Sequence, residues 1–463
     1  MSEQNSDLLK GILKTYSAKN VIMTKNAFIF NTNKCVGCMA CVVGCSIENG
    51  TSLQVNWREV NCHNKIKHPG LPVFHFSLAC NHCEEAPCMK NCPALAYTRD
   101  KETGAIIHHA EACIGCKYCT WACPYDAPKF NPSTQVVEKC NFCVNRISEG
   151  KQPACVQACP VGALSFGQED VNESNHLTPG FVNKGIKPAI QLIPLRDEHR
   201  KPQIENTDAI EIDTKKLESY LPQAESKISL DKEWTLVLFT LAVAGLVSWQ
   251  AAHQFGMIEI PLIPFAIASI LAIALSSLHI GKKLRMWRFV LNLKGSWLSR
   301  EIFSFSAFLG LTGLQIITEN QMFGYAAMAF GLFSLISVDR VYKFLKRKDE
   351  LVCHSAMVSL TAILLFAWLS NISIFIELTI LLKGSLYIWR KGALKKKKQL
   401  WFPVLSVCRI LCLLVPYILW DLGWITILPV YLLITLTGEL IDRAEFYYES
   451  DVVTPKDELR MMN

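Results

Sequence analysis

Sixteen cysteines within the first 160 residues fall into four short motifs, and their spacing limits what the chain can fold into more than any other feature. The first and third motifs read C-x2-C-x2-C-x3-C, the second reads C-x2-C-x4-C-x3-C and the fourth reads C-x2-C-x11-C-x3-C. In chain order the cysteines are Cys35, Cys38, Cys41 and Cys45; Cys80, Cys83, Cys88 and Cys92; Cys113, Cys116, Cys119 and Cys123; Cys140, Cys143, Cys155 and Cys159. Three cysteines separated by short gaps wrap one cubane cluster, and the fourth usually reaches the other cluster of a pair. We therefore expect four [4Fe–4S] clusters and a role in moving single electrons over distance.

Two other uses of cysteine explain this pattern less well. Zinc sites use C-x2-C pairs, but not repeated quartets that end in Cys-Pro, as the last three motifs do. A disulfide framework is typical of small secreted chains. Residues 1–20 are polar and lack an apolar stretch, so we expect no cleavable and no twin-arginine signal.

The apolar residues are divided unevenly along the chain. Hydrophobic residues make up 51% of the 463, and the mean hydropathy of +0.22 is high for a soluble protein. The first 230 residues are polar and rich in cysteine, whereas long apolar runs dominate the rest. The formal net charge of +7 comes largely from lysines and arginines between these runs, so membrane topology explains it better than binding to nucleic acid.

These shifts in composition divide the chain into five parts. We expect an N-terminal lead-in at 1–26, a four-cluster domain at 27–167, an extension and linker at 168–230, a transmembrane anchor at 231–449 and a tail at 450–463. The fold class is an α+β ferredoxin-like double module followed by an all-α polytopic membrane bundle of about eight helices. Within the first module we expect a strand at Ala27–Asn31 and a hairpin at Tyr97–His109 around Gly104.

Eight apolar runs in the second half are each near the ~20 residues that cross a bilayer. They lie at 234–252, 260–280, 301–318, 323–338, 354–370, 372–389, 401–420 and 424–440. The fifth and sixth share only the short link Asn371–Ser373, so seven spans remain an alternative. Buried helices of a large soluble core are the other reading, but soluble folds rarely hold so many runs of this length.

The basic residues fall in alternate loops between these runs. Loops 281–300, 339–350 and 390–400 are rich in lysine and arginine, whereas 253–259, 319–322, 371–373 and 421–423 have none. The positive-inside rule places the basic loops, and with eight spans the cluster domain, on the cytoplasmic side of the plasma (inner) membrane. An alternative is that these loops are basic because they dock an acidic subunit.

At this point the chain resembles a known family. Residues 27–167, through CNHCEEAPCMKNCP, CIGCKYCTWACPYDAP, KCNFC and PACVQACPVGALSFG, closely resemble the iron–sulfur subunit of dimethyl sulfoxide (DMSO) reductase-type molybdoenzymes. The second half resembles the same enzymes' membrane anchor more weakly, through SSLHIGKKLRMWRFVLNLKGSWLSREI (277–302) and GELIDRAEFYY (438–448). The chain is therefore similar to a fusion of two subunits that are usually separate.

The resemblance implies how the motifs share their clusters. In that family the first motif pairs with the fourth and the second with the third. The implied ligand sets are Cys35, Cys38, Cys41 with Cys159; Cys140, Cys143, Cys155 with Cys45; Cys80, Cys83, Cys88 with Cys123; and Cys113, Cys116, Cys119 with Cys92. Some relatives have tryptophan at the position of Cys116 and hold a three-iron cluster, so four irons are expected here. The first motif departs from the pattern by ending in Ser46 instead of proline.

The membrane half suggests a quinol site. Quinol oxidation releases two electrons and two protons, so it needs a hydrogen-bond partner and a proton acceptor, and histidine suits both roles. The resemblance implies that His279 contacts the quinol and that Arg285 and Glu301 match nearby charged positions; an interfacial histidine bonded to lipid headgroups is the other reading.

A bis-histidine haem needs two histidines at matched depth. The anchor has only His253, His279 and His354, near span ends, so no haem is expected. Glu377 and Lys383 lie inside the sixth run and suggest either a proton path or an ion pair.

Three functions fit these features. The leading hypothesis is an electron-transfer and anchor subunit that oxidises menaquinol and passes electrons through four clusters to a separate molybdopterin-containing catalytic reductase subunit. The second runs the same wiring in reverse, from a formate- or hydrogen-type dehydrogenase to quinone. The third is a membrane redox sensor without turnover. Membrane lipid and quinone are expected partners in the first two, and nucleic acid is not.

Overall fold

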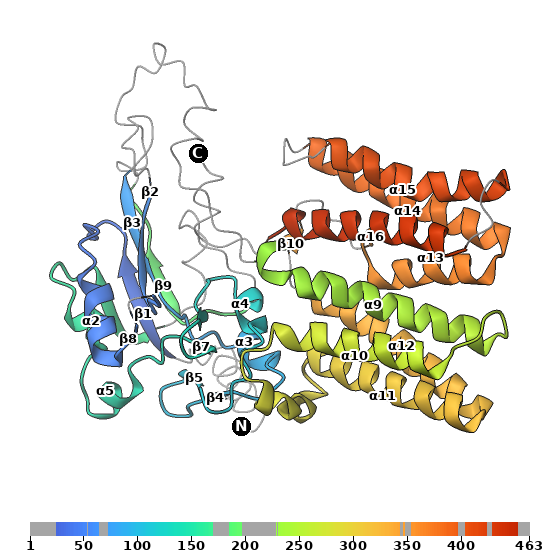
Figure 1. Cartoon of the computed structure of the whole chain (residues 1–463). Helices are drawn as coiled ribbons and strands as arrows, with labels where there is room; N and C mark the ends of the chain where they lie inside the picture. The colour runs from blue at the N-terminus through green and yellow to red at the C-terminus, as the bar shows by residue number, and fades with distance from the viewer. Residues whose placement is uncertain are drawn as a thin grey trace, which may run out of the picture.

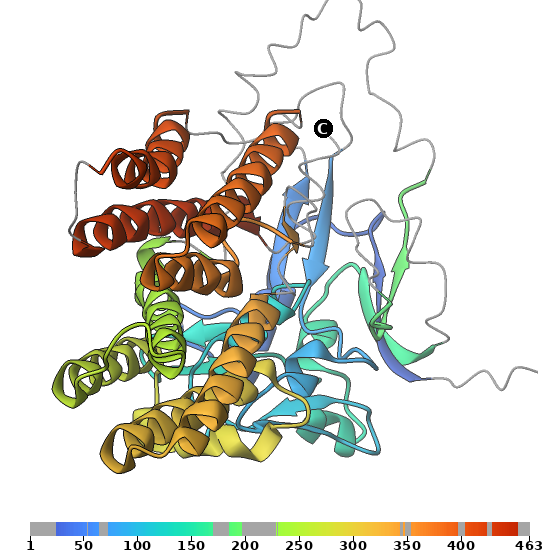
Figure 2. The same ribbon diagram turned by 90° about the vertical axis from the view of Figure 1, so that its right-hand side faces the viewer.

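The computed structural model describes residues 25–52, 54–63, 73–169, 185–196, 228, 230–342, 346–347, 353–396, 403–423 and 428–451. Most of the lead-in, most of the extension at 168–230, half of loop 339–350, the end of loop 390–400 and most of the C-terminal tail lie outside these ranges. Within them the chain forms a small mixed domain and a bundle of long helices, side by side (Figure 1). The long helices run away from the small domain, so that one end of several of them faces it (Figure 1), and Figure 2 shows the molecule from the side of the bundle.

The cysteine-rich domain is built from short strands around its cysteines. Strand β1 (Lys25–Asn31) lies between β8 (Leu164–Glu169), which is antiparallel to it, and β9 (Ile190–Ile193), which is parallel. The strand expected at Ala27–Asn31 is therefore confirmed, and its partner closes the domain from the far end of the sequence. Three two-stranded ladders complete the domain: β2 (Glu59–His63) with β3 (Phe74–Leu78), β4 (Tyr97–Arg99) with β5 (Ile106–His108), and β6 (Lys129–Asn131) with β7 (Val136–Glu138).

The expected hairpin around Gly104 is the β4–β5 ladder. Tyr97 lies opposite His108, and Arg99 lies opposite Ile106. Gly104 has a φ of 76°, which an L-residue with a side chain rarely adopts, and the Asp100 side chain accepts a hydrogen bond from the backbone N–H of Thr103 in the same turn.

Each cysteine motif contributes one or two short helices. These are α2 (Ala40–Asn49) in the first motif, α3 (Pro87–Lys90) in the second, α4 (Tyr118–Ala122) in the third, and α5 (Val144–Ser148) and α6 (Ala154–Gln157) in the fourth. Buried cysteines make up much of the domain's core. Bound clusters would therefore replace apolar side chains as its centre.

Each expected apolar run coincides with a helix of the bundle. The helices are α9 (Leu230–Gln254), α10 (Leu262–Leu278), α11 (Trp297–Thr318), α12 (Gln321–Val341), α13 (Val358–Ser370), α14 (Ser373–Lys396), α15 (Pro403–Asp421) and α16 (Leu428–Glu449). The link at Asn371 separates two helices, α13 and α14, because Asn371 caps α13 in the left-handed conformation at φ 52°.

The number of spans is smaller by length and apolarity alone. Among the described residues, α9, α11, α12 and α15 are long and apolar enough to cross a membrane. A fifth span is obtained if α10 is joined to the 3-10 helix η3 (Lys283–Asn292) across a bend of 92°. Helix α13 is shorter, and α14 and α16 do not pass the same test of length and apolarity, so eight spans remain a prediction.

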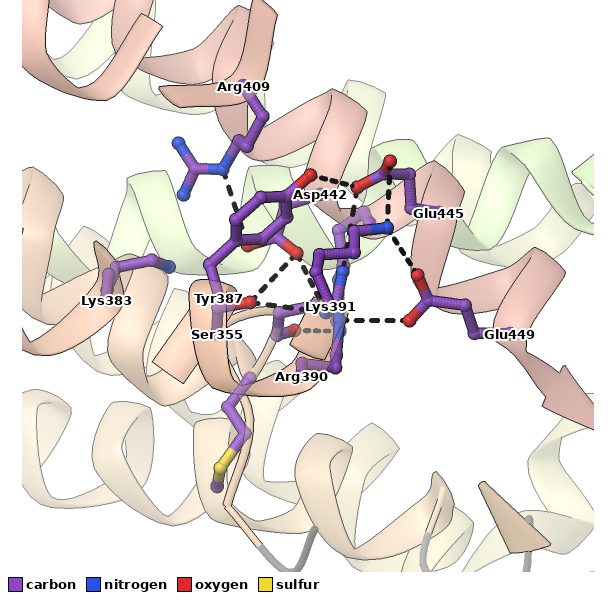
Figure 3. A network of polar contacts seen from close by, with 12 residues as sticks. Ser355, Lys383, Tyr387, Arg390, Lys391, Arg409, Asp442, Glu445 and Glu449 are labelled. Carbon is purple, nitrogen blue, oxygen red and sulfur yellow. Dashed lines mark hydrogen bonds and ion pairs between the residues drawn. The ribbon is translucent and has the colours of Figure 1, made fainter. Parts of the chain in front are cut away.

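The charges on α14 and α16 face one another inside the bundle (Figure 3). Asp442 of α16 lies 2.9 Å from Arg390 of α14, and Lys391 lies 2.9 Å from Glu445. All these side chains are at least nine-tenths buried, as is Arg409 of α15, which lies 3.4 Å from Asp442. Paired charges of opposite sign lose much less by leaving water than isolated ones, so both helices can remain in an otherwise apolar bundle.

The first basic loop joins the two parts of the molecule. Arg285 on η3 donates to the carbonyl oxygens of Ala110 (2.8 Å) and Cys113 (3.3 Å), and Asn292 donates to that of Cys92 (2.9 Å). The backbone N–H of Lys282 donates to the Ile114 carbonyl at 3.0 Å. The bundle therefore holds the small domain by backbone groups of the second and third cysteine motifs.

Candidate functional site

The structure brings the sixteen motif cysteines together in four groups. Cys35 interacts electrostatically with Cys38, Cys41 and Cys159, and Cys83 interacts with Cys80, Cys88 and Cys123. The other two groups are Cys45 with Cys140, Cys143 and Cys155, and Cys119 with Cys92, Cys113 and Cys116. These are the same sets that the family resemblance implies.

Helix packing explains how distant motifs meet. Helix α2 of the first motif packs on α6 of the fourth, and α3 of the second packs on α4 of the third. Gly44 lies at the first contact, where an added Cβ would come within 2.7 Å of the Ala158 Cβ. A side chain at position 44 would separate the two helices and with them the cysteines that they carry.

The donor set of each group fits a cubane cluster. Burial raises the pKa of the Cys45 thiol to about 12, and the neighbouring Cys155 contributes to that increase. Four buried thiols side by side become thiolates readily only when metal replaces their protons. Among the described residues, no three His, Cys, Asp or Glu side chains converge as ligands of a single metal ion.

The loops around these cysteines share one backbone feature. The second residue after the first cysteine of every motif has a positive φ: Gly37 (72°), His82 (41°), Gly115 (72°) and Phe142 (66°). In the last three motifs the backbone N–H of that residue lies 3.4 Å from the sulfur of the first cysteine and donates to it. Amide donors of this kind stabilise negative charge on cluster ligands and tune the reduction potential.

A cavity lies where the third motif meets the bundle. Its lining includes the cluster-ligand candidate Cys116. The lining also includes His279, directly after α10, and Glu301 in the second turn of α11. Apolar and aromatic side chains complete the lining, among them Trp121, Phe239, Ile280 and Tyr342. A mostly apolar lining with a few polar groups is typical of sites that bind small organic molecules.

Two of the three residues that the sequence predicted for a quinol meet in this cavity. The Nδ1 atom of His279 is buried and forms no hydrogen bond of normal geometry within the described residues, although the ring interacts with the backbone of Ser276. Glu301 is 6% exposed, and its carboxylate forms no ion pair or side-chain hydrogen bond within the described part of the chain. Arg285 is different, because it does not line the cavity and its guanidinium bonds the carbonyls of the third motif.

Aromatic residues of the third motif and of the bundle also form the site, and sequence reasoning did not identify them. The Tyr118 hydroxyl donates to the Val341 carbonyl at 3.2 Å, and Trp121 stacks on Tyr342 with ring centroids 6.5 Å apart. Burial, followed by the nearby Glu301, raises the pKa of Tyr118 well above its usual value, so the phenol remains a donor. The stretch CKYCTWAC could have indicated these residues, because aromatic side chains next to candidate cluster ligands in a small domain are expected to pack against a second surface.

The opposite end of the domain exposes the first motif. Cys38 is exposed, and Cys35 and Cys159 are half-buried, whereas most other motif cysteines are buried. Helix α2 lies on the side of the domain away from the bundle (Figure 1). Exposed apolar side chains surround these cysteines: Val36, Met39, Val43, Ile47 and Val161. This surface has the composition of a protein contact.

Comparisons with known proteins find relatives that match less than half of the chain, including its cysteine-rich part. Residues 71–169 match the family described as 4Fe-4S dicluster domain. A polypeptide of the anaerobic dimethyl sulfoxide reductase of Escherichia coli is 34% identical over 161 residues, 33% of this chain and 78% of the relative. A polypeptide of the sulfite dehydrogenase of Allochromatium vinosum is 31% identical over 232 residues, covering 46% of this chain and 88% of the relative. A polypeptide of the tetrathionate reductase of Salmonella typhimurium is 39% identical over 143 residues, covering 30% and 57%.

Proposed function

The chain belongs to the family of iron–sulfur electron-transfer subunits that includes the polypeptide of the Escherichia coli anaerobic dimethyl sulfoxide reductase, and we propose that it oxidises menaquinol and delivers the electrons to a separate catalytic subunit. The membrane-length helices that follow its iron–sulfur domain support this proposal. One observation carries the proposal. The cavity that contains His279 and Glu301 is also lined by Cys116, a candidate cluster ligand. A quinol bound there would lie against the first electron acceptor.

His279 and Glu301 each accept one of the two protons that quinol oxidation releases. The buried Nδ1 of His279 accepts a hydrogen bond from one quinol hydroxyl and takes its proton as the electrons leave. Glu301, buried and free of ion pairs in the described structure, accepts the second proton. Two protons and two electrons leave the quinol, which departs as quinone.

We assign the four cysteine groups to four [4Fe–4S] clusters, which supply one-electron carriers when bound. The groups follow one another from the cavity to the exposed end. Cys116 lines the cavity, and Tyr97 connects Cys119 of the third motif with Cys88 of the second. Cys80 of the second lies near Cys140 of the fourth, and Cys45 of that group lies near Cys41 of the first. This order supports a single route from membrane to surface.

The partner at the exposed end is a large molybdopterin-containing reductase subunit of the DMSO reductase type. The apolar surface of Val36, Met39 and Ile47 beside the exposed Cys38 supports such a contact, because it places the last cysteine group within reach of a docked protein. The relatives' names include a dehydrogenase, so electron flow from such a partner to quinone is the second candidate.

The charge of the loops supports a plasma-membrane location with the cluster domain in the cytoplasm. Labelling of the exposed Cys62 thiol tests this placement. An impermeant maleimide should modify it only after the cells are opened, and labelling in intact cells would contradict the proposal.

The central experiment uses the purified complex with its partner. Reduction of the clusters by a menaquinol analogue is followed by EPR in the parent protein, in His279→Ala and in His253→Ala. We expect His279→Ala to lose quinol-driven reduction by at least tenfold while dithionite still reduces every cluster. His253 is the matched control, because its Nδ1 already bonds the Ile258 carbonyl (3.1 Å) away from the cavity. Normal reduction in His279→Ala would remove the site, and fewer than four irons per cysteine quartet would remove the clusters.

A further inference from the structure

Arg58 is a fully buried arginine inside the cluster domain. Its side chain lies just before β2 and is 1% exposed. The guanidinium carbon lies 4.6 Å from the centroid of the Phe28 ring. One of its terminal nitrogens, Nη1, donates to the Ser77 hydroxyl at 3.0 Å and to the Ser77 carbonyl at 3.5 Å. The same hydroxyl lies 3.5 Å from the sulfur of Cys41.

The rest of the guanidinium has no protein partner among the described residues. Both Nε and Nη2 are buried and make no hydrogen bond, and none of the ion pairs within the described ranges includes Arg58. Paired arginines elsewhere in the domain differ, as Arg146 lies 2.8 Å from Glu48 at the surface. A buried guanidinium without a counter-charge is strongly unfavourable, so another negative group has to compensate it.

The negative groups near Arg58 are cysteines of two clusters. Its strongest electrostatic interactions are with Cys155, Cys140, Cys41 and Cys45. Cys41 belongs to the first-motif group, and the other three belong to the fourth-motif group. Arg58 therefore lies between the two groups that are most distant from the membrane cavity.

A cation in this place acts unequally on the two redox states of a cluster. Each cluster gains one negative charge when it is reduced. In a buried environment of low dielectric constant, that added charge interacts favourably with a nearby fixed cation. The unpaired N–H groups are also available to donate to sulfurs of a bound cluster, and hydrogen bonds of that kind help to set cluster potentials.

We propose that Arg58 sets the reduction potentials of the first-motif and fourth-motif clusters by stabilising their reduced forms, and so draws electrons away from the membrane. The inference rests on the proposed assignment of clusters to these cysteine groups. It gives the electron route a direction that cysteine spacing alone does not supply. Arginine suits the role because it keeps its charge at every physiological pH.

The test is an EPR-monitored redox titration of the intact complex in four forms: parent, Arg58→Met, Arg58→Gln and Arg58→Lys. Methionine replaces the charge with an apolar side chain. We expect both neutral variants to lower the ratio of reduced to oxidised cluster at least tenfold at a fixed potential, for at least one of the two clusters; this corresponds to about 59 mV for a one-electron couple. Arg58→Lys keeps the charge and should retain most of the parent potential.

Arg146→Gln is the matched control, because it removes a cation near the same motifs that Glu48 already neutralises. Its potentials should equal those of the parent. Unchanged potentials in Arg58→Met and Arg58→Gln, with full iron and sulfide content, would overturn the proposal. Loss of both clusters in these two variants but not in Arg58→Lys would also overturn it, since Arg58 would then serve assembly. A parent protein with fewer than four cluster signals would instead refute the proposed function.

Discussion

Removing the carboxylate of Glu439 is the sharpest test of the buried charge network. Glu439 lies 2.6 Å from Lys383 and 2.6 Å from Arg409, accepts a hydrogen bond from Thr361 at 2.6 Å, and is fully buried. Among the described side chains the network is balanced: its cations are Lys383, Arg390, Lys391 and Arg409, and its anions are Glu439, Asp442, Glu445 and Glu449.

The Glu439→Gln change leaves this balance one negative charge short. Arg409 keeps Asp442 at 3.4 Å, but Lys383 keeps only the Thr361 hydroxyl at 3.1 Å. An uncompensated buried charge costs about 3–5 kcal/mol of folding free energy. For a helical domain of this size that corresponds to a melting temperature lower by about 6–20 °C.

A second substitution should repair the damage. Lys383→Met combined with Glu439→Gln restores equal numbers of cations and anions, so the double variant should recover at least about half of the loss, or about 2 kcal/mol. Glu377→Gln is the matched control on the same helix as Lys383, since Glu377 is exposed and accepts one hydrogen bond from Tyr417 at 3.2 Å. Its expected effect is within about 0.5 kcal/mol.

The assay is thermal unfolding of the detergent-solubilised complex, followed by intrinsic fluorescence. The parent, Glu439→Gln, Lys383→Met and the double variant are compared as a double-mutant cycle. A double variant no more stable than Glu439→Gln would show that charge balance does not govern the stability of the network. The same conclusion would follow if Glu439→Gln melted at the temperature of Glu377→Gln.

Three further results are expected. Glu301→Gln should slow quinol-driven cluster reduction at least tenfold without changing reduction by dithionite, as measured by stopped-flow absorbance, because an amide cannot accept the second proton. Gly281→Val should weaken the attachment of the bundle to the cluster domain, because a Cβ there overlaps the Gln135 carbonyl oxygen; limited proteolysis should then separate the two parts while cluster EPR signals persist. Chelation of iron after oxidative cluster loss should unfold the cysteine-rich domain, whose core includes eleven buried cysteines, and leave the far-UV circular dichroism of the bundle in place.

Local patterns predicted the elements of this fold well. The first strand, the hairpin around Gly104 and the helical character of all eight apolar runs follow from periodicity, turn residues and composition within short windows. The grouping of cysteines came from the resemblance, because spacing alone does not say which motifs share a cluster. Contacts such as α2 on α6 depend on residues more than 100 positions apart, for example the approach of Gly44 to Ala158.

The candidate quinol site was predictable only in part, for the same reason. His279 and Glu301 are close in sequence and both lie in the matched anchor segment, so the resemblance identified them together. Arg285 lies in the same segment but turns to the carbonyls of Ala110 and Cys113, which no sequence window could reveal. Tyr342 joins the cavity from the end of α12, far from any recognised motif.

The structural partners of several basic residues weaken the argument from loop charge about the side of the membrane. Arg285 and Arg300 bond backbone carbonyls, and Arg390 and Lys391 lie within α14, where they pair with carboxylates of α16. These four charges have structural roles that do not depend on which side of the membrane they occupy, so they add less to the positive-inside argument than their number in the sequence implies.

The same pairing explains why hydropathy and helix count disagree. A hydropathy average assigns each charge on α14 or α16 the full cost of leaving water alone. In the bundle, Lys383 and Glu439 are separated by 56 positions in sequence but by 2.6 Å in space, so they enter the apolar region as a pair of zero net charge. A hydropathy test applied to one helix at a time does not include this compensation. It therefore excludes α14 and α16, whose charges pair with each other. If the Lys383→Met and Glu439→Gln double variant is more stable than Glu439→Gln alone, α14 and α16 should be counted as one unit when the spans of this chain are determined.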